Sequence, residues 1–199
     1  MEENKVEEQS FYKRHKAKFN FAYMVIICLV IAKLITSFVF ISVVVDGSSM
    51  EKTLQEGDKG ITDGVFYKVF GIDRFDIVIV KPKKYDGLLV KRVIGLPGET
   101  IEYKDSVLYV NGEIVEEEFL TEGVKTESYY GNDIKITLKD NEYYVLGDNR
   151  LNSSDSRSFG AVTKKEIKGA GMMLFAGCKE VNADGSCSGL RLRWPKFVK

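Results

Sequence analysis

One long apolar stretch divides the chain into two regions with different patterns. From Phe19 to Val45 the only charged residue is Lys33. About 20 apolar residues, each rising about 1.5 Å in a helix, are enough to cross a hydrocarbon core. The pattern therefore predicts one transmembrane helix over residues 19–42, with the ammonium of Lys33 extending outward to the interface. Residues 1–18 form a polar tail before this helix.

The charges that flank the apolar stretch predict its orientation. The tail ends in a basic cluster, and basic flanks stay on the cytoplasmic side of a membrane. We therefore expect residues 1–18 in the cytoplasm and residues 43–199 outside, in a single-pass protein of the cell membrane. The alternative is a cleavable signal peptide, whose apolar core runs over about 7–15 residues and ends in small residues. This stretch is longer and ends in SVVVD, which favours an uncleaved signal anchor.

Beyond the membrane segment the pattern changes to short runs rich in β-branched and aromatic residues, which is typical of strands. Asn111-Gly112 separates two such runs and predicts a tight hairpin, because a type I′ turn needs positive φ at both central residues. No helical periodicity outside the membrane segment extends beyond two or three turns, and Thr163–Ile167 is compatible with one turn. Residues 43–199 are therefore predicted to form one mainly β domain. The predicted strands are Phe75–Val80, Leu88–Ile94, Val107–Val110, Ile134–Leu138 and Tyr143–Leu146.

Composition narrows the function classes. The net charge is +0, from 29 basic and 29 acidic residues, so no global field attracts nucleic acid. We expect no nucleic-acid partner. The single histidine, His15, precedes the membrane segment and must lie across the bilayer from any site in the β domain. This excludes a Ser-His-Asp triad and disfavours a histidine-containing zinc site, and we expect no metal or other cofactor.

Ser49 is a candidate nucleophile in VDGSSMEKTL, directly after the apolar stretch. Taken alone, this stretch is equally well a Gly/Ser turn. A nucleophilic serine needs a base, and without histidine the base must be a carboxylate or a lysine. A free lysine is almost fully protonated at pH 7, but burial can lower its pKa by up to about 3–5 units. A lysine inside an apolar strand is therefore the residue to seek.

Lys91 meets this description in LLVKRVIGLPG. A strand there places Lys91 and Val93 on one face and Val90, Arg92 and Ile94 on the other. The alternative is an edge strand whose Lys-Arg pair faces solvent and discourages aggregation.

A third polar stretch, GDNRLNSSDSR, follows the apolar run YYVL. The composition of this stretch alone indicates only a polar loop. Its position after a strand, and its density of charged and hydroxyl side chains, predict a functional loop held by hydrogen bonds and ion pairs. These side chains are Asp148, Asn149, Arg150, Ser153, Asp155 and Arg157.

Four motifs occur in the order found in type I signal peptidases: SSM-x-x-TL, FDIVIVKP, LVKRVIGLPGE and GDNRLNSSDSR. The chain resembles this family, also called leader peptidases, over residues 19–176, and its Gram-positive-like branch in particular. The resemblance implies a signal peptidase/LexA-like β-fold and a membrane-bound serine endopeptidase without cofactors. It also implies that the partners are the lipid bilayer and preprotein signal peptides with Ala-X-Ala sites.

The resemblance further assigns roles to individual residues. It makes Ser49 the nucleophile and Lys91 the general base, together a Ser-Lys dyad. Ser153 would orient the Lys91 amine, and Asp155 and Arg157 would pair to hold the loop. A neutral orienting partner suits a lysine base, because an adjacent carboxylate would keep the amine protonated.

The remaining residues of the implied site are supporting or cleft residues. Asp148 and Arg150 would support the loop. Met50 would adjoin the substrate cleft, whose shallow apolar pockets take small residues at positions −1 and −3. Gly47 stands in the cleft where some members have a serine that donates to the oxyanion.

The chain departs from the family at two other positions. Lys52 stands where the usual motif has proline, and Phe75 replaces a glycine. The tail beyond Phe175 has no recognised counterpart. In this tail, Cys178 and Cys187 lie on the outer side, where thiols tend to oxidise, so either a disulfide or two free thiols fits the sequence.

Three alternative functions remain open from sequence. A membrane-tethered assembly factor with a silent dyad would fit the departures, but the joint presence of Ser49, Lys91 and Ser153 argues against it. LexA-like autoproteolysis lacks a DNA-binding module before the β domain. A peptidase dedicated to a few surface proteins, such as pilus proteins, is not distinguished from a general one.

Overall fold

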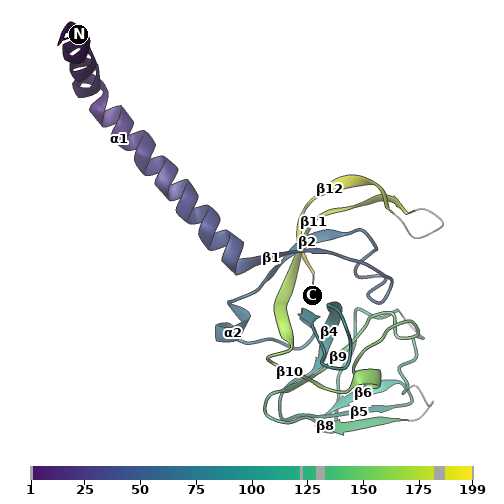
Figure 1. Cartoon of the computed structure of the whole chain (residues 1–199). Coiled ribbons are helices and arrows are strands. Elements are labelled where there is room, and N and C mark those ends of the chain that lie inside the picture. The colour runs from purple at the N-terminus through teal and green to yellow at the C-terminus, as the bar shows by residue number, and fades with distance from the viewer. Residues whose placement is uncertain (1, 122, 129–132, 182–186, 199) are drawn as a thin grey trace. The chain divides into compact units, whose positions relative to one another are not determined.

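The computed structural model describes residues 2–121, 123–128, 133–181 and 187–198, and the chain divides into two compact units after Val39. The first unit holds helix α1, Glu2–Val39. The second holds every strand that the structure describes (Figure 1). Within these described ranges, no helix is long and apolar enough to cross a membrane.

Helix α1 differs in extent from the helix predicted over residues 19–42. It begins in the polar tail and ends at Val39, where strand β1, Phe40–Val44, begins. The sequence of β1 is FISVV, and β-branched and aromatic side chains favour a strand. Strand β2, Lys59–Asp63, pairs with β1 along its whole length, from Phe40 opposite Asp63 to Val44 opposite Lys59.

The larger sheet is antiparallel throughout and places strand β4, Leu89–Gly95, in its interior. Along the sheet the order is β1-β2-β11-β3-β4-β9-β10, and β12 pairs with β11. The strands predicted from Phe75–Val80, Leu88–Ile94 and Tyr143–Leu146 are confirmed with small changes at their ends. The bounds not yet given are β3 Ile77–Val80, β9 Glu142–Leu146, β10 Val162–Thr163, β11 Ile167–Val181 and β12 Cys187–Val198.

The smaller sheet has the order β7-β6-β5-β8. Its hairpin turn has φ of 52° at Asn111 and 89° at Gly112, which confirms the predicted Asn-Gly turn. Thr163–Ile167 contains one turn, in which Glu166 N–H donates to the carbonyl of Thr163 at 2.9 Å. The bounds are β5 Thr100–Lys104, β6 Val107–Val110, β7 Glu113–Ile114 and β8 Ile134–Thr137, and two short helices are α2 Tyr67–Phe70 and α3 Ser156–Phe159.

The described residues of the β unit form three apolar clusters. One packs on the large sheet around Val78, Val93 and Val145, and a second includes Ile94 and Ile101. The third, called here the Met50 cluster, lies at the turn between β1 and β2. Its buried members are Val45, Met50, Leu54, Ile77, Met172 and Leu174, and Val43, Val90 and Val198 pack against it while partly buried.

Cys178 and Cys187 lie on the β11–β12 hairpin. Cys178 is opposite Leu190 in the strand register, and Cys187 is opposite Val181. Their side chains lie outside the part of the chain that the structure describes, so the disulfide stays a prediction.

Candidate active site

Ser49 lies in the turn between β1 and β2, which is anchored by two buried side chains. Met50 is 1% exposed and Leu54 is fully buried, both in the Met50 cluster. Leu54 N–H donates to the Met50 carbonyl at 2.8 Å, so one tight turn follows Ser49. Gly47 before it has φ of 87°, a conformation that favours glycine. The local sequence thereby fixes the position of the serine.

Lys91 reaches this turn from the interior strand β4. Its Nζ donates to Ser49 Oγ at 2.7 Å and to the Val90 carbonyl at 3.0 Å. The residue is only 1% exposed, and its strand is paired on both sides. The alternative of a solvent-facing edge lysine is therefore wrong.

Burial changes the protonation of this lysine. Desolvation lowers the pKa of Lys91 from its ordinary value of 10.5 to about 8. The negative charges of Asp155 and Asp148 oppose the shift, and the positive charge of Arg157 adds to it. About a tenth of the amine is therefore neutral at pH 7, so the form that a general base requires is present.

The third polar stretch packs directly against Ser49. Asn149 N–H donates to the Ser49 carbonyl at 3.0 Å. Ser153 is buried next to Gly147: a Cβ at Gly147 would lie 2.6 Å from Ser153 Cβ and 2.5 Å from the Ser49 carbonyl oxygen. The structure thus brings Ser153 and Ser49 together around a glycine with no room for a side chain. The predicted bond from Ser153 to the Lys91 amine stays a prediction.

Asp155 and Arg157 form the ion pair that the family resemblance implied. Arg157 Nη2 lies 2.7 Å from Asp155 Oδ2, and its Nε donates to Oδ1 at 2.9 Å. Asp155 also accepts from Gly147 N–H at 3.2 Å and from the Arg157 backbone N–H at 3.2 Å, where it caps α3. The carboxylate therefore ties the start of the loop to its end.

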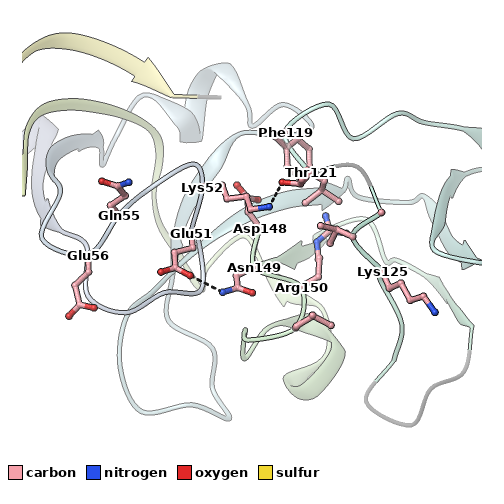
Figure 2. Close-up of a pocket in the computed structure, with 14 residues that line it drawn as sticks. Glu51, Lys52, Gln55, Glu56, Phe119, Thr121, Lys125, Asp148, Asn149 and Arg150 are labelled. Carbon is pink, nitrogen blue, oxygen red and sulfur yellow. Dashed lines mark hydrogen bonds between the residues drawn. The ribbon is translucent and has the colours of Figure 1, made fainter. Parts of the chain in front are cut away.

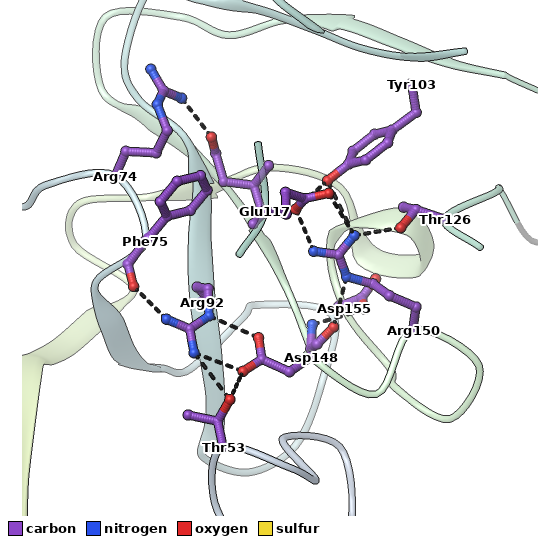
Figure 3. A network of polar contacts seen from close by, with 12 residues as sticks. Thr53, Arg74, Phe75, Arg92, Tyr103, Glu117, Thr126, Asp148, Arg150 and Asp155 are labelled. Atoms are coloured by element: carbon purple, nitrogen blue, oxygen red, sulfur yellow. Dashed lines mark hydrogen bonds and ion pairs between the residues drawn. The ribbon is translucent and has the colours of Figure 1, made fainter. Parts of the chain in front are cut away.

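Asp148 pairs with Arg92, a residue that the sequence did not single out as functional (Figure 3). Arg92 donates from Nε and Nη2 to the two carboxylate oxygens at 2.8 Å and 2.7 Å. Thr53 Oγ1 donates to the same carboxylate at 2.5 Å. Both charged side chains are at most 2% exposed. This bidentate pair links β4, the serine turn and the polar loop.

Arg150 pairs with Glu117, a second residue that the sequence did not single out as functional (Figure 3). The Nη2–Oε1 distance is 2.5 Å, and Tyr103 Oη donates to the same Oε1 at 2.9 Å. Arg150 also donates to the Thr126 hydroxyl. The sequence does not identify Glu117 as the partner, because it is one of three consecutive glutamates and nothing local shows which of them is buried.

The two departures from the family motif both have a backbone of positive φ: 82° at Lys52 and 71° at Phe75. Lys52 Nζ donates to the Thr121 hydroxyl (Figure 2). The Phe75 ring packs edge-on against Phe119 at a centroid distance of 5.1 Å, and Phe119 lies 4.0 Å from the guanidinium carbon of Arg92. Both residues therefore contact the segment that carries Phe119 and Thr121.

A cavity of about 960 Å³ adjoins the serine turn and the polar loop (Figure 2). Glu51 and Lys52 line it from the turn, and Asn149 from the polar loop. Within the described ranges, no group of three His, Cys, Asp or Glu side chains is placed to hold a metal ion.

A mainly β domain with a serine hydroxyl bonded to a buried lysine has the arrangement of a hydrolase that uses lysine as its base. Comparison with known proteins identifies the family. Residues 18–176 match the family model described as signal peptidase, peptidase S26. The chain therefore belongs to the signal peptidase family, peptidase S26, and is a hydrolase of the serine peptidase class.

Two curated relatives agree with this assignment. Signal peptidase I S of Bacillus subtilis (strain 168) is 38% identical, over 81% of this chain and 91% of its own length. Signal peptidase I V of the same strain is 42% identical, over 72% of this chain and 90% of its own length. A crystal structure of a signal peptidase I from Enterococcus faecalis V583 is 38% identical, covers 49% of this chain and 93% of that one, and has a TM-score of 0.43. The predicted family and its Gram-positive-like branch are confirmed.

Proposed function

We propose that this chain removes N-terminal signal peptides from exported preproteins, with Ser49 as nucleophile and Lys91 as general base. The observation that carries the proposal is the 2.7 Å hydrogen bond from Lys91 Nζ to Ser49 Oγ, made by a lysine that is 1% exposed. Family membership and the printed names of the relatives support the substrate class.

In the acylation step, neutral Lys91 accepts the proton of Ser49 as Oγ attacks the scissile carbonyl carbon. A C–O bond forms, and the carbonyl oxygen becomes an oxyanion near the Ser49 backbone N–H. The Lys91 ammonium then gives its proton to the leaving nitrogen as the C–N bond breaks. The mature protein leaves with a free amino terminus, and the signal peptide stays on Ser49 as an ester.

In the deacylation step, neutral Lys91 accepts a proton from water, and the oxygen of that water attacks the ester carbon. Ser49 leaves and recovers a proton from the Lys91 ammonium. The products are the signal peptide carboxyl end and the free enzyme, so the site returns to its starting protonation. Asp155 and Arg157 hold the loop, and Ser153 orients the amine.

The substrate residues that precede the scissile bond are proposed to bind next to the Met50 cluster. Met50 directly follows Ser49 and Val90 directly precedes Lys91, so the cluster adjoins both reacting side chains. The shallow apolar pockets that the family resemblance implies for the small residues of an Ala-X-Ala site would lie beside this buried cluster, and the extended substrate would pair along a strand edge.

We further propose that residues 19–42 anchor the protein in the cell membrane, with residues 1–18 in the cytoplasm and residues 43–199 outside. The support is the apolar sequence between Phe19 and Val45 and the basic cluster before it. This arrangement brings the site to the bilayer face where exported preproteins emerge.

The test is cleavage of a preprotein with an Ala-X-Ala site by the full chain in detergent, followed by mass spectrometry of the new amino terminus. We expect Ser49→Ala and Lys91→Ala to lower the rate by at least about 1,000-fold. The matched controls are Ser154→Ala and Lys84→Ala, at exposed positions, which should cut like the wild type. Cleavage by Lys91→Ala at the wild-type rate would show that the base is wrongly assigned.

A further inference from the structure

A second cavity of the β unit has a volume of about 520 Å³ and is called here the lysine cavity. Lys68 lines it from α2, Lys164 and Lys165 from the segment before β11, and Lys168 from the start of β11. None of the described residues that line it carries a carboxylate, and the others are Tyr67, Asn141 and Ile167. Four positive charges around one cavity repel one another, so the site favours an anionic ligand.

The ammonium groups of this cavity are bonded to backbone carbonyls. Lys164 Nζ donates to the Lys68 carbonyl at 3.3 Å. Lys168 Nζ donates to the Lys165 carbonyl at 2.8 Å. The nearby carboxylate of Glu166 accepts hydrogen bonds from backbone N–H groups. A carbonyl acceptor leaves the positive charge of a lysine uncompensated, and each ammonium has three donors, so donors remain for an anion.

An apolar patch adjoins Lys68 on the same helical turn. The rings of Phe66 and Phe70 have a centroid distance of 6.1 Å, and Phe70 is 83% exposed. Tyr67 faces the opposite way, and its hydroxyl donates to the Ile167 carbonyl at 2.8 Å, which fixes α2 to β11. Exposed apolar side chains next to basic ones are typical of segments that lie on a membrane. The exposed members, called here the α2 patch, are Val65, Phe66, Val69 and Phe70.

The register of β1 and β2 places α2 where the chain enters the β unit. Phe40, the first residue of β1, is opposite Asp63, the last residue of β2. The Asp63 carboxylate accepts hydrogen bonds from the N–H groups of Val65 and Phe66 at 2.8 Å and 2.7 Å, and so holds the start of α2. If residues 19–42 anchor the chain, Phe40 lies at the outer membrane face, and the α2 patch lies close to that face too.

We propose that the α2 patch and the lysine cavity together dock the β unit on the outer membrane surface, where the cavity holds the phosphate of an anionic phospholipid. The proposal rests on the proposed membrane anchor. The apolar patch alone suits any bilayer, whereas four lysines without a lining carboxylate select an anionic headgroup. A second contact beside the anchor restricts how the β unit turns on the bilayer.

The first test measures lysine acetylation by mass spectrometry in the full chain, reconstituted in nanodiscs of phosphatidylcholine with or without phosphatidylglycerol. We expect Lys68, Lys164 and Lys168 to react at least about threefold more slowly when phosphatidylglycerol is present. Lys104 and Lys135 are exposed on the small sheet and should react equally in both discs. Equal rates for the cavity lysines in both discs, or the same slowing at the two control lysines, would overturn the proposal.

Inorganic phosphate separates the two sources of the anion. The same rates are measured for the full chain in detergent, with and without phosphate at millimolar concentration. We expect little protection of the cavity lysines there, because the α2 patch adds its contact only on a lipid surface. Protection by free phosphate as strong as in the anionic discs would overturn docking on lipid and leave a phosphate site only.

The second test uses two double variants with the same change of net charge. In Lys164→Glu/Lys168→Glu, the protection of Lys68 by phosphatidylglycerol should be lost, because the cavity no longer attracts an anion. In Lys104→Glu/Lys135→Glu it should persist. Protection that persists in both variants would overturn the proposal.

Cleavage of a soluble peptide separates this proposal from the proposed function. In detergent both double variants should cleave like the wild type, because Ser49 and Lys91 do not line the lysine cavity. A wild-type chain that enters the discs and cleaves, but shows no protected lysines, would refute the docking alone. A wild-type chain that does not enter the discs would refute the anchor, and the docking with it.

Discussion

Lys91 donates a hydrogen bond to Ser49 across 2.7 Å, although 42 positions separate the two residues in the sequence. The serine is on the turn between β1 and β2, and the lysine is on β4. These elements meet because β11 pairs with β2 and with β3, and β3 pairs with β4. The reacting pair is therefore a product of the order of strands in the large sheet.

The first prediction concerns the pH dependence of cleavage. Catalysis needs neutral Lys91, whose pKa burial lowers to about 8. We expect kcat/KM to rise about tenfold between pH 7 and pH 9 and then to level off, because the neutral fraction follows this pKa. A peptide assay over pH 6–10 measures the curve. A midpoint near 10.5, the value of an exposed lysine, would contradict the assignment.

The same pKa predicts how stability depends on pH. The folded pKa is about 8 and the ordinary value is 10.5, so between these values the unfolded chain binds more protons than the folded one. Wild-type stability should therefore rise with pH through this window, and the buried ammonium should destabilise the fold below it. We expect Lys91→Met to be more stable than wild type at pH 6–7 and to lose this advantage by pH 10.5. Thermal unfolding at several pH values, with Lys84→Met as control, measures the difference. A constant difference at all pH values would contradict it.

Gly147 should not tolerate a side chain. An added Cβ would lie 2.5 Å from the Ser49 carbonyl oxygen and would also collide with Ser153. We expect Gly147→Ala to lower kcat by about 100-fold, because displacements of about 1 Å in a catalytic site have effects of this size. The control is Gly95→Ala, which is crowded by the side chains of Ile101 and Leu138 in another cluster and should cost stability more than activity. Equal loss of kcat in both variants would mean that general destabilisation explains the result.

Asp148 should matter more for stability than any surface carboxylate. Asp148→Ala leaves the fully buried Arg92 guanidinium without its ion pair, and such a change costs about 3–5 kcal/mol. Glu142→Ala is the control, because its partner Lys139 is 79% exposed and the pair is worth at most about 1 kcal/mol. Chemical unfolding of both variants gives the free energies. Similar values for the two would mean that Arg92 finds another partner.

The backbone at Lys52 should not accept proline, the residue that the family motif has at this position. The φ of 82° at Lys52 is closed to proline, whose ring fixes φ near −65°. We expect Lys52→Pro to cost about 3 kcal/mol of stability or to shift the turn and reduce kcat/KM. Lys52→Gly keeps the backbone conformation and loses only the contact with Thr121, so it should behave almost like wild type. Wild-type behaviour of the proline variant beside a damaged glycine variant would refute the backbone argument.

Several features of the fold and site were available from the sequence. The strands around Val107–Val110 and Tyr143–Leu146 follow from dense β-branched and aromatic residues, and the hairpin follows from Asn111-Gly112, because these signals are local. The placement of Lys91 inside an apolar run made it the candidate base, while a solvent-facing position at a sheet edge stayed open as the alternative. What the run did not decide was whether its strand is interior or at an edge, because that depends on β3 and β9 pairing on its two sides.

The sequence by itself determined which residue types are available for chemistry: one serine after an apolar stretch, one lysine in an apolar strand, and no histidine in the β domain. Only the tertiary structure decided the partners, such as Arg92 for Asp148, Glu117 for Arg150 and the Met50 cluster for Val198. The sequence does not determine these partners for a physical reason. Side-chain alternation along a strand fixes only the face of the strand on which a residue lies. The group opposite it is set by long-range pairing, which no local pattern encodes.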